Sequence, residues 1–244
     1  MERYFYDFHL HSCLSPCADN DMTPSDIVGM GMLAGLQILA LTDHNSTANC
    51  PAFFHAAETV GVIPVAGMEL ETAENIHVVC LFGTLSGAMS FGDEVAERRF
   101  PIKNRPEIYG EQLIVDHEDN ILGTDPKLLV VATGIGLTEV PEMVDRHGGV
   151  CYPAHIDRPS NGIIAILGDI PPDFPTECVE LNDMSKRGEM IKSRPSLSGK
   201  KFLSGSDAHR LDAIRDAEHT IYLDGDSPDE IRKNLVKSIK LGRI

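Results

Sequence analysis

The sequence is poor in positive charge. Its 244 residues include 21 Lys and Arg against 37 Asp and Glu, which gives a formal net charge of −16. Affinity for long nucleic acid depends largely on cations that displace counterions from phosphates. We therefore expect long DNA or RNA to be an unlikely partner. A small phosphorylated substrate stays compatible with this charge, because bound metal cations can reverse the local field.

Cysteine and long apolar segments are also scarce. Six cysteines are too few for a disulfide scaffold in a chain of this length. No apolar run approaches the ~20 residues that a membrane span needs, so no membrane partner is expected. The first ten residues are charged and aromatic, unlike a signal peptide. These features favour a cytoplasmic protein with reduced thiols, and they indicate no particular oligomeric state.

Short apolar runs alternate with helical patterns, which is typical of an α/β fold built from βα units. Thr23 before Pro24 and Ser227 before Pro228 predict two helix starts, since Ser or Thr caps a helix and Pro suits its first position. Segment 86–138 breaks the alternation, and a polar turn at 117–120 predicts a hairpin there. We predict a single domain over residues 1–244 with an inserted helix and hairpin segment at about 86–138. The expected strands are 4–10, 38–42, 62–66, 76–82, 150–154, 177–181 and 201–204.

Histidine and carboxylate residues lie in or just after these strands. His9 and His11 are two positions apart, so in an extended strand both imidazoles point to the same side. Asp207 and His209 repeat this spacing with mixed ligand types. In an α/β barrel the carboxyl ends of the strands meet at one mouth. A mixture of imidazole and carboxylate suits Mn, Fe or Zn, so the pattern predicts a metal site at that mouth.

Five segments together resemble the successive motifs of the PHP (polymerase and histidinol phosphatase) family. They occur in the family's order over nearly the whole chain. The resemblance implies a distorted seven-stranded, TIM-like (β/α) barrel with two or three divalent metal ions at the C-terminal face of the strands. It also implies hydrolysis of phosphate esters. The five segments are Phe8-His9-Leu10-His11-Ser12, Leu41-Thr42-Asp43-His44-Asn45, Gly67-Met68-Glu69, Pro153-Ala154-His155 and Gly205-Ser206-Asp207-Ala208-His209.

The resemblance also implies a set of ligands. Asp19 is favoured over Asp21 by its distance from the Thr23-Pro24 helix start, although the loop is longer here than in the family. His77 is favoured over His117, which lies in the predicted hairpin turn. One ion would be held by His9, His11, Glu69 and Asp207, a second by Glu69, His77 and His155, and a third by Asp19, His44 and His209.

The predicted activity is hydrolysis of a small phosphorylated substrate, a nucleotide or another phosphomonoester, by a metal-bridging hydroxide. His44 or His209 would also serve as proton donor to the leaving group, and Arg158 and Arg210 would bind the phosphate. One alternative is an exonuclease or phosphodiesterase acting on short oligonucleotides. C–N bond hydrolysis is a related possibility, and a non-catalytic metal-binding regulatory module is a further alternative.

Overall fold

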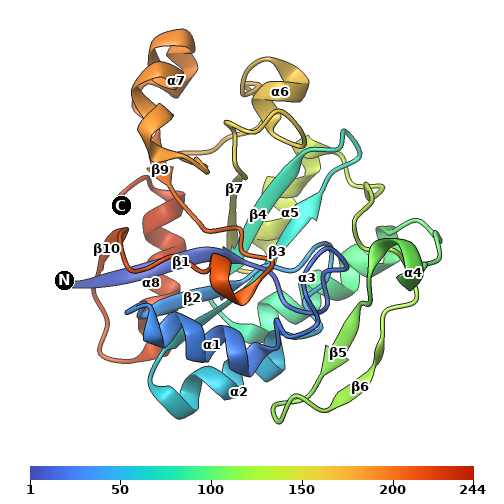
Figure 1. Cartoon of the computed structure of the whole chain (residues 1–244). Coiled ribbons are helices and arrows are strands. Elements are labelled where there is room, and N and C mark those ends of the chain that lie inside the picture. Colours follow the sequence, from blue (N-terminus) through green and yellow to red (C-terminus); the bar gives the residue numbers. More distant parts are fainter.

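The core of the protein is a mixed sheet of six strands in the order β10-β1-β2-β3-β4-β7. The computed structural model covers residues 1–244 and shows this sheet strongly curled, with helices packed around it (Figure 1). The strands match the expected runs to within a few residues, except that β3 is longer and β10 was not expected. They are β1 Glu2–Leu10, β2 Ile38–Leu41, β3 Ile63–Glu71, β4 His77–Phe82, β7 Gly149–Pro153 and β10 Thr220–Leu223.

Strand direction decides which side chains meet. β1, β2 and β3 run parallel, whereas β4 is antiparallel to both β3 and β7. Glu71 at the end of β3 therefore pairs with His77 at the start of β4. The N-terminal end of β4 consequently lies at the same edge of the sheet as the C-terminal ends of β1, β2, β3 and β7.

Two short strands, β8 Cys178–Glu180 and β9 Lys201–Leu203, form a separate parallel pair. Isolated backbone bonds link the ends of this pair to the main sheet. The Ile156 N–H donates to the Glu180 carbonyl over 2.9 Å, and the Asp207 N–H donates to the His9 carbonyl over 2.9 Å. The predicted α/β class is confirmed, but the continuous ladder of a seven-stranded barrel is not found. Strands of only three residues make too few bonds to close it.

Helices bury both faces of the sheet. All four side chains of β2 are buried, and they alternate between two apolar cores. Leu39 packs in the core that holds Phe53, and Ile38 packs in the core that holds Leu235. This explains why the strand reads as a continuous apolar run. The helices are α1 Pro24–Leu33, α2 Cys50–Val60, α3 Leu85–Arg98, α4 Pro106–Tyr109, α5 Val140–Arg146, α6 Ile163–Leu167, α7 Arg187–Ser193 and α8 Pro228–Lys240.

Both predicted helix caps are present. The Thr23 hydroxyl accepts the Asp26 N–H at the start of α1, and the Ser227 hydroxyl accepts the Glu230 N–H at the start of α8, each over 3.3 Å. These bonds satisfy amide groups that have no partner inside the helix. None of the helices combines the length and apolar composition needed to cross a bilayer. All six cysteines are free.

The expected hairpin forms β5 Leu113–Val115 and β6 Ile121–Thr124 (Figure 1). It is fastened to loops that follow β1 and β2. The Leu113 N–H donates to the Cys13 carbonyl over 2.9 Å, and the Val115 N–H donates to the Asn49 side chain over 3.1 Å. His117 in its turn contacts His55 of α2, with ring centroids 4.3 Å apart and the two rings tilted. The division into one domain with an insertion stays a prediction.

The two faces of α1 predict opposite sensitivities to truncation. Ile27 is fully buried and Leu33 is 76% exposed. Ile27→Ala should lower the free energy of unfolding by about 2–5 kcal/mol because it leaves a cavity. Leu33→Ala, the matched control, should change it by no more than about 0.5 kcal/mol. Urea unfolding measures both, and equal losses would contradict the packing described here.

Candidate metal centre

Glu69, a buried residue of β3, lies at the centre of a cluster of histidines. Each of five imidazoles places a ring nitrogen within 3.3 Å of one of its carboxylate oxygens. A buried carboxylate with so many nitrogen neighbours is the geometric centre of the site. The distances are 3.3 Å to His9, 3.3 Å to His11, 3.1 Å to His44, 2.8 Å to His77 and 2.9 Å to His155.

Asp207 is the second carboxylate of the cluster. Its Oδ1 lies 3.1 Å from His11 Nε2, 3.5 Å from His9 Nε2 and 3.6 Å from His209 Nδ1. The other oxygen, Oδ2, forms an ion pair of 2.6 Å with Arg158. Asp207 therefore joins the histidines of β1 to a cation on the loop after β7.

The strand ends account for this convergence. His9 and His11 end β1, Glu69 lies in β3, and His155 and Asp207 lie just beyond β7 and β9. His44 follows β2 and pairs with Glu69 in an isolated parallel bridge. His77 reaches the same edge because β4 runs in the opposite direction. The prediction that these strand-end residues share one mouth holds in the structure.

Several atoms of the cluster are buried and lack a hydrogen-bond partner. They include Nε2 of His9 and of His11, Nδ1 of His44, Oε2 of Glu69 and Oδ1 of Asp207. Buried polar atoms without partners are rare in proteins and require an explanation. Imidazole nitrogens and carboxylate oxygens are also the donor set of Zn, Mn and Fe sites. The residues present therefore fit divalent metal ions.

Three overlapping groups bring ligand atoms within 4.8 Å of one another. One contains His9, His11, Glu69 and Asp207, which is the set expected for the first ion. The other two share His44 and differ from the expected sets, since His44 groups with Glu69 and His77 as well as with His11 and His209. The groups are His9, His11, Glu69 and Asp207; His44, Glu69 and His77; and His11, His44 and His209.

Neighbouring acids orient the first two histidines. Glu180 accepts the Nδ1–H of His9, with oxygens 2.9 and 3.0 Å away, which leaves the Nε2 lone pair facing Glu69 and Asp207. His11 uses a relay, because its Nδ1 lies 3.0 Å from the Ser15 hydroxyl, which in turn donates to Asp43 over 2.7 Å. Such partners fix the tautomer and ring orientation of a metal-binding histidine.

Sequence reasoning missed Glu180 and Asp7. Both are buried, and Glu180 also accepts the backbone N–H of His155 over 3.1 Å. Asp7 accepts the N–H groups of His9 and Ser206, each over 3.1 Å, and burial raises the pKa of Asp7 to about 6. The signal was available, since each acid is flanked on both sides by apolar or aromatic residues of a predicted strand. A buried acid of this kind requires a partner.

Burial and charge oppose each other in the cluster. Burial by itself would raise the pKa of Glu69, but the surrounding histidines, His77 first among them, hold it well below its usual range. Burial would lower the pKa of His77, yet the Glu69 carboxylate raises it to about 10. Burial together with His11 lowers the pKa of His209 to about 4. Within the cluster, the protonation state of each group therefore depends on the charges of its neighbouring histidines and carboxylates.

The backbone is unusual at two of the candidate ligands. His155 has φ +29° and Asp207 has φ +53°, values that residues other than glycine seldom adopt. Such conformations persist where the surrounding structure enforces them, and they concentrate at functional sites. Gly205 is required nearby, because a Cβ at this position would overlap the Cβ of His9.

The two arginines and Asp19 lie in different surroundings. Arg158 reaches the cluster through Asp207 and is 38% exposed at the mouth of the site. Arg210 points away, 3.4 Å from Asp212 and 3.7 Å from Asp19, without contact to the cluster. Asp19 is exposed, and it is absent from the three ligand groups. Its assignment as a ligand, and that of Arg210 as a phosphate-binding residue, stay predictions.

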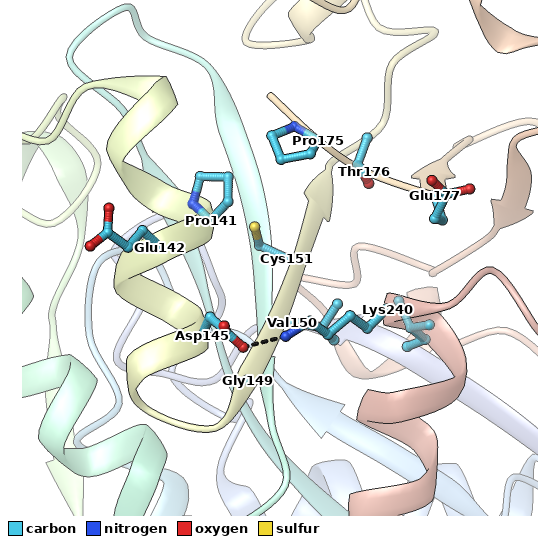
Figure 2. Close-up of a pocket in the computed structure, with 11 residues that line it drawn as sticks. Pro141, Glu142, Asp145, Gly149, Val150, Cys151, Pro175, Thr176, Glu177 and Lys240 are labelled. Carbon is cyan, nitrogen blue, oxygen red and sulfur yellow. Dashed lines mark hydrogen bonds and ion pairs between the residues drawn. The ribbon is translucent and has the colours of Figure 1, made fainter. Parts of the chain in front are cut away.

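A cavity of about 420 Å³ lies away from this centre. It is enclosed by α5, the start of β7, the segment before β8 and the end of α8 (Figure 2). Gly149 lines it at the opposite end of β7 from His155, and Lys240 and Asp145 form an ion pair across it. None of the predicted site residues lines this cavity, so it is not part of the metal centre.

Comparison with known proteins identifies the family. Residues 7–152, more than half of the chain, match the model of the PHP domain. The chain therefore belongs to the PHP domain family. It is 34% identical over 79 residues to a 5'-3' exoribonuclease of Haemophilus influenzae, a match that covers 31% of this chain and 28% of that protein.

The fold is also shared with solved structures. The lesion-specific endonuclease PfuEndoQ of Pyrococcus furiosus has a TM-score of 0.63 at 20% identity, over 98% of this chain and 56% of that one. Endonuclease Q in complex with a 27-mer duplex substrate has the same TM-score and identity, over 95% of this chain and 56% of that one. The chain thus spans about half the length of these structures and less than a third of the exoribonuclease.

The expectation that long nucleic acid is an unlikely partner conflicts with these comparisons. Endonuclease Q was solved with a 27-mer duplex at its active site, and the exoribonuclease relative is named for action on RNA. A net charge of −16 therefore does not decide against nucleic acid in this fold. Net charge averages over the whole surface, whereas a substrate meets only the field near the site.

Loss of the Glu180 carboxylate should weaken metal binding. Glu180→Ala frees the ring of His9 and removes an acceptor for the His155 N–H, which should cost about 10–100-fold in metal affinity. The matched control is Glu177→Ala, which removes an exposed carboxylate from the same segment. Isothermal titration of chelator-treated protein with Zn²⁺ measures the difference. Equal affinities in the two variants would rule out the orienting role.

Proposed function

We propose that the protein is a metal-dependent phosphoesterase. The observation that carries the proposal is the set of buried, unpartnered nitrogen and oxygen atoms around Glu69 and Asp207. Membership of the PHP domain family supports it, and so do the fold neighbours that cleave phosphodiesters. The proposed ligands, for two or three ions of Mn, Fe or Zn, are His9, His11, Asp19, His44, Glu69, His77, His155, Asp207 and His209.

Divalent ions at these residues would lower the pKa of water to supply a nucleophile and would offset the charge on the phosphoryl oxygens. The protein contributes orientation. Glu180 and Ser15 fix the imidazoles of His9 and His11 with their Nε2 atoms facing Glu69 and Asp207. Exclusion of water from this buried cluster strengthens every charge interaction within it.

Residues at the mouth would meet the substrate. Arg158 is partly exposed, and its guanidinium can form two parallel hydrogen bonds to a phosphate in addition to its contact with Asp207. His209 is less buried than the other histidines of the cluster, and its Nδ1–H donates to the Asp207 carbonyl over 2.9 Å. His44 and His209 are the candidates for donating a proton to the leaving oxygen.

The first candidate substrate is a small phosphorylated molecule, a nucleotide or another phosphomonoester. The second is a short oligonucleotide, cleaved by an exonuclease or phosphodiesterase activity, and the comparisons favour it specifically. The relative from Haemophilus influenzae is an exoribonuclease, and the two fold neighbours described above are endonucleases. Initial rates on p-nitrophenyl phosphate and bis-p-nitrophenyl phosphate distinguish the two candidates, because only the second compound is a diester.

Removal of Asp207 should abolish hydrolysis. Asp207→Ala deletes a carboxylate shared by three histidines and one arginine, so turnover on either nitrophenyl substrate should fall below about 1% of the wild-type rate. Elemental analysis should show less bound metal, and circular dichroism should show a retained fold. Asp173→Ala, a change of an exposed aspartate, is the control. Full activity in a verified metal-poor Asp207→Ala protein would refute the metal-dependent mechanism.

Metal removal should also lower stability. Ions that bind only the folded state stabilise it by about 2.7 kcal/mol at a concentration one hundred times their Kd. Protein treated with a chelator should therefore melt at a lower temperature in differential scanning fluorimetry. Addition of Mn²⁺ or Zn²⁺ should restore the melting temperature, and Ca²⁺ should not, since Ca²⁺ prefers sites made only of oxygen. An unchanged melting temperature would count against buried metal sites.

A further inference from the structure

The segment from the end of α3 to the start of α4 differs in charge from the rest of this acidic protein, and Glu107 and Glu111 follow it. From Arg98 to Arg105 it contains four basic residues and no acidic one. Arg98 and Arg99 are paired with carboxylates, Arg98 with Glu139 at 3.4 Å and Arg99 with Asp125 at 2.7 Å. The other two cations of the segment, Lys103 and Arg105, are exposed and have no carboxylate partner.

A third unpaired cation lies beside them. Lys103 pairs with Lys127 in an isolated antiparallel bridge, and the Leu128 N–H donates to the Ile102 carbonyl over 2.8 Å on the same pair of segments. Residues directly opposite each other in such a bridge project to the same face, where like charges repel. The ammonium of Lys127 contacts the Ala96 carbonyl over 3.3 Å and no acid. A bound anion would remove this repulsion.

Aromatic side chains accompany the cations. Phe100 is 49% exposed and Tyr109 is 38% exposed, both large values for aromatic residues. The Arg105 guanidinium lies 5.6 Å from the centroid of the Tyr109 ring and donates to its hydroxyl over 3.4 Å. The guanidinium therefore lies over one face of the ring, and part of the ring stays open to solvent.

This surface adjoins the metal centre. Gly110, next to Tyr109, packs so closely on the loop after β1 that a Cβ there would overlap the Pro16 carbonyl oxygen. The same loop contains Ser15, which contacts His11 Nδ1. The loop after β1 therefore contacts both the end of α4 and the candidate ligand His11. Figure 1 shows α4 beside that loop and α8 on the other side of the molecule.

We propose that the basic strip, formed by Phe100, Lys103, Arg105, Tyr109 and Lys127, binds a single-stranded oligonucleotide whose scissile bond lies at the metal centre. The inference rests on the phosphodiesterase form of the proposed function. The cations of the strip have no carboxylate partner within the protein, so they favour a negatively charged ligand such as a phosphate backbone. The exposed rings select unpaired bases, which stack on aromatic side chains irrespective of sequence. A duplex would hide those base faces.

The first experiment distinguishes binding of a strand at the strip from catalysis at the metal centre. A labelled strand of eight nucleotides with phosphorothioate linkages, made as RNA and as DNA, serves as the probe in fluorescence anisotropy. The variant Lys103→Gln with Arg105→Gln should weaken binding about tenfold and flatten the slope of log K against log salt by about 1.4, since each phosphate contact on a single strand contributes about 0.7. Its rate on bis-p-nitrophenyl phosphate should stay within about twofold, because that small diester is too short to reach the strip.

A second variant tests stacking. Tyr109→Ala should weaken binding of the strand about fivefold or more, and Tyr109→Phe should retain wild-type binding, because the ring and not the hydroxyl stacks on a base. A structural role confined to the hydroxyl contact with Arg105 would instead make Tyr109→Phe lose as much binding as Tyr109→Ala, because both changes remove the hydroxyl. Comparison of the RNA and DNA strands shows whether the 2'-hydroxyl contributes, and either preference is compatible with the strip.

The matched control removes the same charge elsewhere. Lys233→Gln with Lys237→Gln changes two exposed lysines of α8 and should leave binding of the strand unchanged. Equal losses in both double variants would mean that overall charge alone governs binding and would overturn the proposal. Tighter binding of a duplex of the same length would also overturn it. If wild-type protein binds the strand but cleaves no diester, the nuclease form of the proposed function fails while the strip is confirmed by the binding data.

Discussion

Glu69 and the imidazoles around it form the interaction on which the rest of the site depends. Taking a carboxylate out of water is costly unless opposite charges and hydrogen bonds compensate for the loss of solvation. Here five ring nitrogens surround the carboxylate, and they come from the ends of β1, β2, β4 and β7. The buried Glu69 carboxylate is therefore stable only where these strand ends bring the histidines around it. Its contacts with the histidines in turn hold the strand ends together.

The backbone bonds that close the curled sheet also help to hold the site together. β8 and β9 are too short to form long ladders, yet they join the main sheet at Glu180 and at Asp207. Glu180 uses its carbonyl to bind Ile156 and its carboxylate to bind His9 and His155. The backbone bonds that complete the curl and the side-chain bonds that orient the histidines therefore involve the same residue.

Charge is distributed unevenly in relation to this centre. The protein as a whole is strongly acidic, but the mouth of the site has Arg158, and the neighbouring segment has unpaired Lys103, Arg105 and Lys127. The electric field of these cations acts locally, since charges more than ~8–10 Å from an exposed group are largely screened at physiological salt. The overall composition was for this reason a poor guide to partners, and the positions of a few cations are more informative.

Much of the fold and the site could be predicted from periodicity and local chemistry. Apolar runs, caps such as Thr23 and Ser227, and the spacing of His9 and His11 are properties of neighbouring residues, and they identified most strands, the helix starts and the candidate ligands. The family's motif pattern then suggested how these residues group around two or three ions. The edge strand β10 and the short helices α6 and α7 were not predicted, because four to seven residues have too little periodicity to stand out.

Residue type and spacing along the chain were enough to identify histidines and acids at strand ends and a PHP-like order of motifs. Which of these residues meet depends on the folded structure. It reversed β4 so that His77 faces Glu69, it brought Glu180 to His9 across 171 positions, and it left Asp19 and Arg210 at the surface. The reason is physical: local pattern fixes which side of its own strand a residue occupies, whereas strand direction and long-range pairing fix what lies opposite it.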